Sequence, residues 1–261
     1  MTDQADNNET MGRVRLMAGE DVQSVAAGLL DLTGIDSVLL LPSSLSRRDA
    51  LVASVRREMR SAGVESHLEL PGNPLARLSR LARGGDRWRA VTISPPDRES
   101  RMVRLPSKLL DAGQVWVVTD IDVVSGRGPY ALDLLSRYVD PLSRAKHLGS
   151  REREVLTVDV NLVRTPDRYV MLKDAGAFVL GAVTSDPIAA ELLALSLADE
   201  DLTRDHRVTG PWEDPMVQRA TELDLGARLP QDIRVAVSGQ PTGMIEDTVA
   251  RILARIGVSW P

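Results

Sequence analysis

The sequence predicts an α/β protein of three layers, in which a mostly parallel sheet carries helices on both faces. Three observations favour this fold. Residues 35–70 read as a strand, a turn, an amphipathic helix, a glycine and a second strand, which is the order of a right-handed crossover between parallel strands. The run VWVV at 115–118 is continuously apolar, as expected of a buried strand. Ser185-Asp186-Pro187 then marks a helix start, because a capping side chain precedes a proline that suits the first turn.

The elements up to residue 70 follow from hydrophobic spacing. Residues 1–12 are polar and acidic without periodicity, so a disordered tail is expected there. A strand is expected over 13–17, and the helix over 19–32 has apolar residues at helical spacing. The crossover is expected to comprise a strand over 35–41, a helix over 46–62 with basic residues on its outer face and Gly63 at its end, and a strand over 64–70.

The middle of the chain is less regular. Residues 71–107 open with Pro-Gly-Asn-Pro and predict an irregular basic subregion within one domain over 13–261. The elements expected from here to residue 150 are a short basic helix over 75–82, a strand over 90–94, a loop over 95–100, a short helix or turn over 105–110, the central strand over 115–124, a helix over 130–138 and a basic connection over 140–150.

The remaining residues alternate again between strands and helices. Strands are predicted over 155–163, 169–172, 177–183 and 233–237. Helices are predicted to begin at Pro187, over 215–223 and over 248–256. No repeat, coiled coil or low-complexity linker interrupts this order, which favours one α/β unit.

Composition excludes several kinds of site. No apolar run approaches the roughly 18 residues that a membrane span needs, and the acidic start is unlike a secretory signal, so a cytoplasmic protein is expected. The chain has no cysteine and three histidines, so we expect neither a metal nor a redox cofactor. It also lacks the G-x-S-x-G elbow of α/β-hydrolases and the G-x-x-x-x-G-K-[ST] loop that binds nucleotide phosphates.

The charge is unevenly distributed. The whole chain carries a formal charge of −5, whereas residues 43–110 contain 14 basic and 7 acidic side chains. A basic segment in an acidic protein indicates an anionic partner. The candidates are a phosphorylated or sulfated small molecule, an acidic protein and nucleic acid. Nucleic acid is the weakest of these, because the chain is acidic, has few aromatic residues and contains no recognisable nucleic-acid-binding motif.

Two acids mark the end of the central strand. Asp120 and Asp122 are two residues apart, so the pleat directs both to one face. Ligands of open parallel sheets bind at the carboxyl ends of the strands. Two carboxylates this close raise the pKa of one of them, which makes it a better proton acceptor near neutral pH. These are the predicted catalytic acids. The alternative is that they cap the following loop or pair with Arg127.

The predicted substrate-binding residues lie near strand ends. Ser43 and Ser44 follow the VLLL strand and precede the helix that carries Arg47, so hydroxyls, helix N–H groups and a guanidinium can bind an anion; simple helix capping is the alternative. Ser125 and Arg127 belong to a Ser-Gly-Arg-Gly turn whose glycines permit close approach of an anion.

Two further residues complete the candidate set. Lys173 ends the strand YVML and is expected to reach the same face as Asp120. His147, in the basic connection, is a candidate general acid, with a solvated loop histidine as the alternative.

Three segments resemble the DUF362 family of α/β proteins. AGEDVQSVAAGLLDLTGIDSVLLLPSSL with the following SRRDALVASVRREMRSAGVE is similar to the family's opening crossover, and LLDAGQVWVVTDIDVV to its central strand. GAVTSDPIAAELLALSL and MVQRATELDLGARLPQDIRVAVSG are similar to its "DPVAxD" helix and its ending. Together these segments span most of residues 13–239. The resemblance implies the same α/β fold.

The departures from that family bear on function. Many members carry cysteine clusters, which this chain lacks, so the resemblance supports no electron-transfer role. Where the family usually has Pro-Lys-x-Lys-x-His, an ungapped placement puts TDIDVV at 119–124. Two aspartates in place of two lysines reverse the favoured ligand charge and suit a cation, or an amine that must lose a proton.

Two functions are consistent with these features. The first is an enzyme that closes a ring when an amine displaces a sulfate- or phosphate-like group. In size, cysteine-free core and basic segment the chain is also similar to aziridine-forming enzymes of azinomycin-type antibiotic biosynthesis. This second resemblance implies specialised metabolism and a substrate tethered to an acidic carrier protein. The other function is a non-catalytic DUF362-like scaffold that binds an acidic partner.

Overall fold

The computed structural model describes residues 13–43, 50–69, 88–121, 131–140, 157–199, 210–238 and 243–259. In these ranges one sheet has seven strands in the order β3-β2-β6-β7-β8-β1-β9. Its strands are β1 (Arg13–Gly19), β2 (Ser37–Pro42), β3 (Glu65–Leu68), β6 (Val115–Asp120), β7 (Arg168–Asp174), β8 (Val179–Thr184) and β9 (Arg234–Ser238). Of these strands, β8 alone runs opposite to the rest, because it pairs antiparallel with both β7 and β1.

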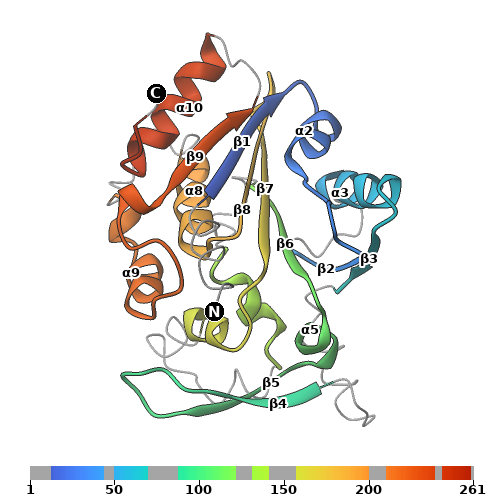
Figure 1. Cartoon of the computed structure of the whole chain (residues 1–261). Helices are drawn as coiled ribbons and strands as arrows, with labels where there is room; N and C mark the ends of the chain where they lie inside the picture. Colours follow the sequence, from blue (N-terminus) through green and yellow to red (C-terminus); the bar gives the residue numbers. More distant parts are fainter. Residues whose placement is uncertain are drawn as a thin grey trace, which may run out of the picture.

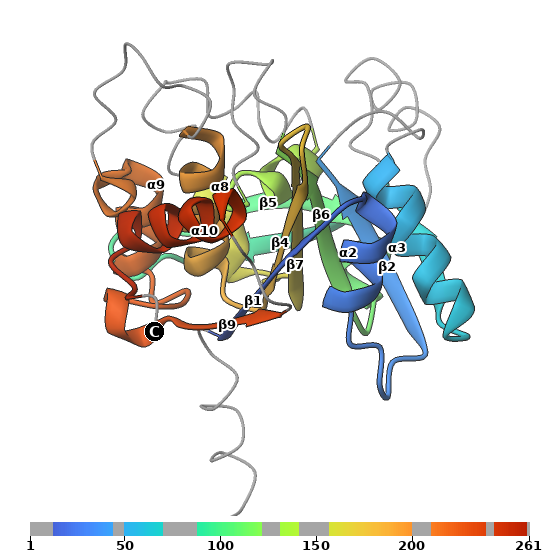
Figure 2. The same ribbon diagram turned by 90° about the horizontal axis from the view of Figure 1, so that it is seen from above.

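Helices cover both faces of this sheet. Figures 1 and 2 show α2 (Val22–Leu29) and α3 (Ala50–Ser61) on one face, and α8 (Pro187–Asp199), α9 (Pro215–Glu222) and α10 (Met244–Arg255) on the other. Shorter elements are α5 (Ser107–Asp111) and the 3-10 helices η2 (Leu134–Tyr138), η3 (Val160–Leu162), η4 (Pro211–Glu213) and η5 (Pro230–Asp232). The predicted three-layer, mostly parallel α/β fold is confirmed.

The apolar sequences of the central elements follow from their place in these layers. Residues 115–119 of β6 are all buried, since one set of alternate side chains packs toward α2 and α3 and the other toward α8. Helix α8 is apolar around most of its surface because it lies between the sheet and the helices α9 and α10. Among the described helices, none has the length and apolar character that crossing a membrane would take.

The connection from β1 to β2 crosses the sheet through α2. This helix packs so closely on β8 that a Cβ added at Gly181 would lie 2.4 Å from Cγ1 of Val25 and 2.5 Å from Cδ1 of Leu29. The absence of a side chain at Gly181 therefore sets the height of α2 above the sheet. The strands β2 and β3 are parallel and joined through α3, as the crossover pattern predicts.

Residues 88–106 form a regular hairpin. Strands β4 (Trp88–Ile93) and β5 (Arg101–Pro106) pair antiparallel in a second, two-stranded sheet. This hairpin lies within the subregion predicted over 71–107, and β4 overlaps the strand predicted over 90–94. The short helix or turn expected over 105–110 begins only at Ser107. The strand β5 is missed because Arg101, Met102 and Arg104 interrupt any simple alternation of apolar and polar residues. The helix predicted over 75–82 lies outside the described residues.

The predicted strand over 155–163 is wrong. Residues 157–162 form a helical turn that ends in η3, and its Asp159 and Asn161 are as buried as its valines. The Asn161 amide donates to the carbonyl oxygens of Val158 (2.9 Å) and Leu132 (3.1 Å). The sequence VDVN alternates with a strand-like period, but partners in other segments make both sets of side chains interior.

Asp186 joins two distant parts of the chain. Its Oδ1 accepts hydrogen bonds from the backbone N–H groups of Ile188 and Ala189, each at 2.8 Å, which confirms the predicted helix start. Its Oδ2 accepts the N–H of Ala227 at 2.8 Å. A Cβ added at Gly226 would lie 2.4 Å from Oδ1, so glycine allows this approach. One buried carboxylate thus caps α8 and holds the turn that precedes β9.

We expect Asp186→Ala to lower the free energy of unfolding in urea by about 2–4 kcal/mol, because it removes a helix cap and leaves the buried Ala227 N–H without its acceptor. Asp214→Ala is the matched control. Asp214 caps α9 by accepting hydrogen bonds from the N–H groups of Met216 and Val217, which belong to the same helix. Removing this carboxylate should therefore lower the free energy of unfolding by about 1 kcal/mol. Equal losses in the two variants would show that the link to Ala227 adds nothing.

Candidate functional site

After the neighbouring parallel strands β2 and β6, the chain continues toward opposite edges of the sheet. From β2 the chain passes through α3 to β3 on one face, and from β6 it passes through η2 and η3 to β7 on the other. In open α/β sheets, ligands bind outside the carboxyl ends of the strands where the direction of winding reverses. The carboxyl ends of β2 and β6, called here the switch point, are therefore the candidate site.

Two residues predicted from the sequence lie at the switch point. Ser43 directly follows β2 and continues its ladder, since its N–H donates to the Val118 carbonyl of β6 at 2.9 Å. Asp120 is exposed at the end of β6 after five buried residues. The side chains at the end of each strand are thus the first that can meet a ligand.

Strand register separates these two residues by face. Asp120 is opposite Leu172 of β7, whose side chain packs with the core under α2 and α3. Ser43 comes two residues after Leu41, which belongs to the core under α8. Because side chains alternate along a strand, Asp120 and Ser43 lie on opposite sides of the sheet edge.

Lys173 does not share the face of Asp120, so that expectation is wrong. The buried Lys173 side chain comes two residues after Met171, on the face covered by α8, and its Nζ donates to the Leu197 carbonyl at 2.5 Å. This carbonyl belongs to the last turn of α8, where a positive charge is favourable. An ammonium committed to α8 is not directed toward the ligand side of Asp120.

The 3-10 helix η2 places further groups over the strand ends. The Tyr138 hydroxyl lies 2.9 Å from the Glu69 carbonyl and 3.3 Å from the Pro42 carbonyl, so it spans the ends of β3 and β2. Arg137 Nη1 donates to the Ser43 carbonyl at 3.3 Å, and its Nη2 lies 3.2 Å from Asp133 Oδ2. The Arg137 guanidinium, partly exposed, is therefore fixed beside Ser43.

Sequence analysis did not single out Arg137 or Tyr138. One local pattern could have identified Arg137. Asp133 and Arg137 are four residues apart, a spacing at which an acid and a base in a helix can form an ion pair that fixes the guanidinium. The hydrogen bonds that carry these side chains to β2 and β3 join positions more than 65 residues apart, and no local pattern encodes them.

Six predicted site residues lie outside the described residues: Ser44, Arg47, Asp122, Ser125, Arg127 and His147. Their roles stay predictions, as does the raised pKa expected of an Asp120–Asp122 pair. The described residues on either side of 122–130 are fixed to the body. The Ile121 N–H donates to the Leu172 carbonyl at 2.7 Å, and the Leu132 N–H donates to Oε2 of Glu191 at 2.9 Å.

Glu191 is a buried acid that sequence analysis missed. It is fully buried in α8, and burial raises its pKa well above the usual range, against the N–H groups of Leu132 and Ala131, which lower it. A single acid within IAAELLALSLA was the signal that could have identified it, because a charge in an apolar helix needs a partner. Its Leu132 hydrogen bond holds the chain where it enters η2.

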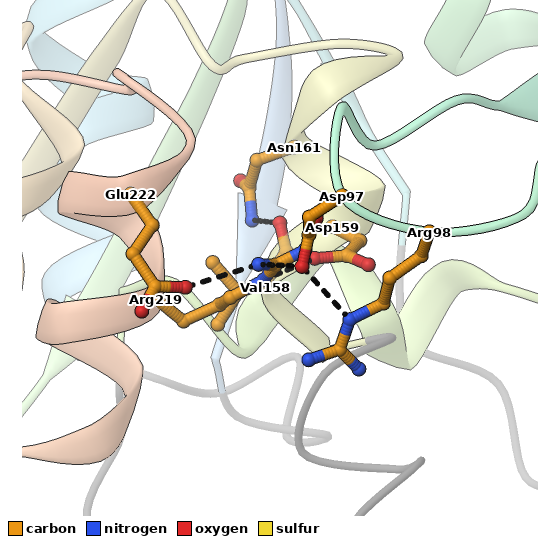
Figure 3. A network of polar contacts seen from close by, with 7 residues as sticks. All are labelled: Asp97, Arg98, Val158, Asp159, Asn161, Arg219 and Glu222. Atoms are coloured by element: carbon orange, nitrogen blue, oxygen red, sulfur yellow. Dashed lines mark hydrogen bonds and ion pairs between the residues drawn. The ribbon is translucent and has the colours of Figure 1, made fainter.

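A second polar cluster surrounds Arg219 of α9 (Figure 3). Its Nε donates to Asp159 Oδ1 at 2.9 Å, and Nη1 and Nη2 donate to the two oxygens of Asp97, each at 2.9 Å. Nη1 also lies 3.0 Å from Glu222 Oε2. The Arg219 hydrogen bonds hold the pKa of Asp97 well below its usual range, whereas burial raises the pKa of Asp159.

The Arg219 cluster is structural. It ties the loop between β4 and β5, which carries Asp97, to α9 and to the helical turn at 157–162. Each nitrogen of the Arg219 guanidinium already binds a carboxylate, so the guanidinium serves to hold these three acids together. Within the described ranges, no group of three or more histidine or acidic side chains is placed to hold a metal ion.

We expect Glu191→Gln to remove one source of pH dependence from stability. The native pKa of Glu191 is raised, so the folded state favours the neutral acid. Wild-type stability from this group is therefore present below the unfolded pKa, near 4.5, and is lost as the pH rises toward the folded value. Glutamine keeps an acceptor for Leu132 and carries no charge, so the variant should gain stability relative to wild type between pH 5 and pH 8 in urea unfolding.

Glu213→Gln, which changes the same residue type at an exposed position, is the control and is measured at the same two pH values. A loss of stability in Glu191→Gln that is larger at pH 8 than at pH 5 would mean that the fold requires the charged form.

Comparisons with known proteins do not assign this site. No model of a known protein family matches the chain, and no curated protein matches it. The resemblance to the DUF362 family therefore stays a prediction, and the functional argument depends on the residues at the switch point.

Proposed function

We propose that this chain is an enzyme that closes a ring by intramolecular displacement, with its active site at the switch point. The observation that carries the proposal is the position of Asp120 and Ser43 at the carboxyl ends of β2 and β6, where the winding of the sheet reverses. The sequence alone also predicts Asp120 as a residue that binds an amine and Ser43 as a residue that binds an anion.

The two sides of the sheet edge suit the two ends of one substrate. On one side the Asp120 carboxylate can bind an ammonium group and accept its proton. On the other side the Ser43 hydroxyl and the Arg137 guanidinium can bind a sulfate or phosphate ester. A substrate that spans the edge thereby has its nitrogen and its reacting carbon held in one orientation, which lowers the entropic part of the barrier.

The proposed step is balanced without a redox partner. The ammonium proton passes to Asp120, and the amine nitrogen attacks the carbon that carries the ester oxygen. A C–N bond forms as the C–O bond breaks, and sulfate or phosphate leaves with the bonding electron pair. The Ser43 hydroxyl and the Arg137 guanidinium donate hydrogen bonds to the leaving group and so stabilise the negative charge that develops on it. The resemblance to aziridine-forming enzymes favours a three-membered ring and a role in antibiotic biosynthesis.

A non-catalytic scaffold that binds an acidic partner is the second candidate. The outer face of α3 favours it, since Arg57 and Arg60 are exposed there as the sequence predicts, while Arg56 reaches the Ser66 hydroxyl of β3 at 3.3 Å. An acidic carrier protein that delivers the substrate would satisfy both proposals, because one partner would then bind the basic face and supply the amine.

We expect Asp120→Asn to lower turnover by about 10²–10⁴-fold, the usual contribution of a general base. The assay uses 2-aminoalkyl sulfate and phosphate esters and measures released sulfate or phosphate together with the cyclic amine by mass spectrometry. Urea unfolding of the variant, compared with wild type, separates a loss of turnover from a loss of folded protein.

Asp174→Asn is the matched control, because Asp174 is also an exposed aspartate at the carboxyl end of a strand, but of β7, outside the switch point. It should keep full turnover. Ring product formed equally well by Asp120→Asn would disprove the role of Asp120. If the wild-type protein releases neither anion, the scaffold becomes the better explanation.

A further inference from the structure

The β4–β5 hairpin has one face in the core and one face in solvent. Its inner face contributes Ile93, Val103 and Leu105 to the core under α8. On the outer face Ala90 lies opposite Arg104, and Thr92 lies opposite Met102, and all four are exposed. These four residues are called the hairpin face below. Met102 is 70% exposed, more than any other large apolar side chain in the part of the chain that the structure describes.

The hairpin is held rigidly against the body at three points. Near its base Arg89 Nη2 forms an ion pair with Asp111 of α5 at 2.9 Å. In β5 the Arg104 carbonyl accepts the Asp140 N–H at 3.0 Å. At the tip, the two carboxylate oxygens of Asp97 accept hydrogen bonds from Nη1 and Nη2 of Arg219, each at 2.9 Å. Figure 3 shows Asp97 beside Arg219. A surface fixed in this way loses little conformational entropy when a partner binds.

The charge around the hairpin face indicates the chemistry of that partner. The face carries Arg104 and no acid, and it lies within residues 43–110, where basic side chains outnumber acidic ones 14 to 7 in a chain of net charge −5. Methionine and arginine are also enriched at protein interfaces, whereas alanine is not. An exposed methionine beside an arginine thus offers an apolar contact and a charge to the same partner.

We propose that the hairpin face is a docking surface for an acidic protein. A second copy of this chain is a poorer occupant, because two copies that each carry a net charge of −5 repel one another. The proposal does not depend on the ring closure described above, since the surface and its test involve no substrate.

The test is a titration of the full chain, labelled at its methionine methyl groups with ¹³C, with poly-glutamate as the acidic probe. Met102→Leu identifies the Met102 signal. We expect this signal to shift in a saturable way, and the shift to disappear in about 1 M salt. Met244 is the internal control, since it is 62% exposed in the first turn of α10 beside Glu246 and Asp247, and its signal should not move.

Charge reversals locate the contact. Arg104→Glu should weaken the binding of poly-glutamate by at least about fivefold. Arg228→Glu is the matched control, because Arg228 is an exposed arginine beyond α9, and it should leave the affinity unchanged. Urea unfolding of both variants checks that the fold is retained.

Three outcomes would overturn the proposal. The first is an absence of any Met102 shift with poly-glutamate, or an equal shift of Met244. The second is a loss of binding in Arg57→Glu, Arg60→Glu but not in Arg104→Glu, which would place the acidic partner on α3. The third is a Met102 shift that depends on protein concentration without the probe, which would identify a second copy as the occupant.

Discussion

Burial of both faces of the central strands constrains the rest of this molecule. In β2 and β6 the backbone N–H and C=O groups are paired with neighbouring strands, and the side chains from Leu39 to Leu41 and from Val115 to Val118 are inside the protein. Neither strand can present a polar group to a ligand along this length. The first positions able to do so are at the strand ends, and these are Ser43 and Asp120. The place of the candidate site is therefore a consequence of the packing.

The same packing explains the positions of the buried ionisable side chains. A buried ionisable group destabilises the fold unless it is paired or hydrogen-bonded, and four such side chains each bond a separate segment. Asp186 joins α8 to the turn before β9, Lys173 joins β7 to the last turn of α8, and Arg219 joins the hairpin to α9. Glu191 joins α8 to the start of η2. These side chains hold the irregular connections in place on a sheet that is itself apolar.

Elements that local sequence patterns determine were predicted correctly, whereas residues placed by contacts with distant segments were not. The strands β2 and β6 and the helix α8 were predicted because local patterns determine them: an unbroken apolar run, or a cap followed by proline. The turn at 157–162 was predicted as a strand because Asp159 and Asn161 alternate with valines, whereas their burial depends on Arg219 and Leu132 in distant segments. For the same reason Ser43 and Asp120 could be predicted at strand ends, while Arg137 depends on a contact 94 residues away.

If the switch point closes rings as proposed, its charges bear on which end of the substrate is recognised first. Arg137 is already paired with Asp133 through its Nη2 at 3.2 Å, so the two together contribute little net charge. Asp120 places an exposed carboxylate on the other side of the sheet edge. In the proposed reaction, this carboxylate attracts the ammonium end of the substrate over distance, whereas the anionic end is bound at short range by hydrogen bonds. Lys173 would cancel this field if it shared the edge with Asp120. Its burial against α8 keeps the positive charge on the other face, which is consistent with the amine substrate proposed above.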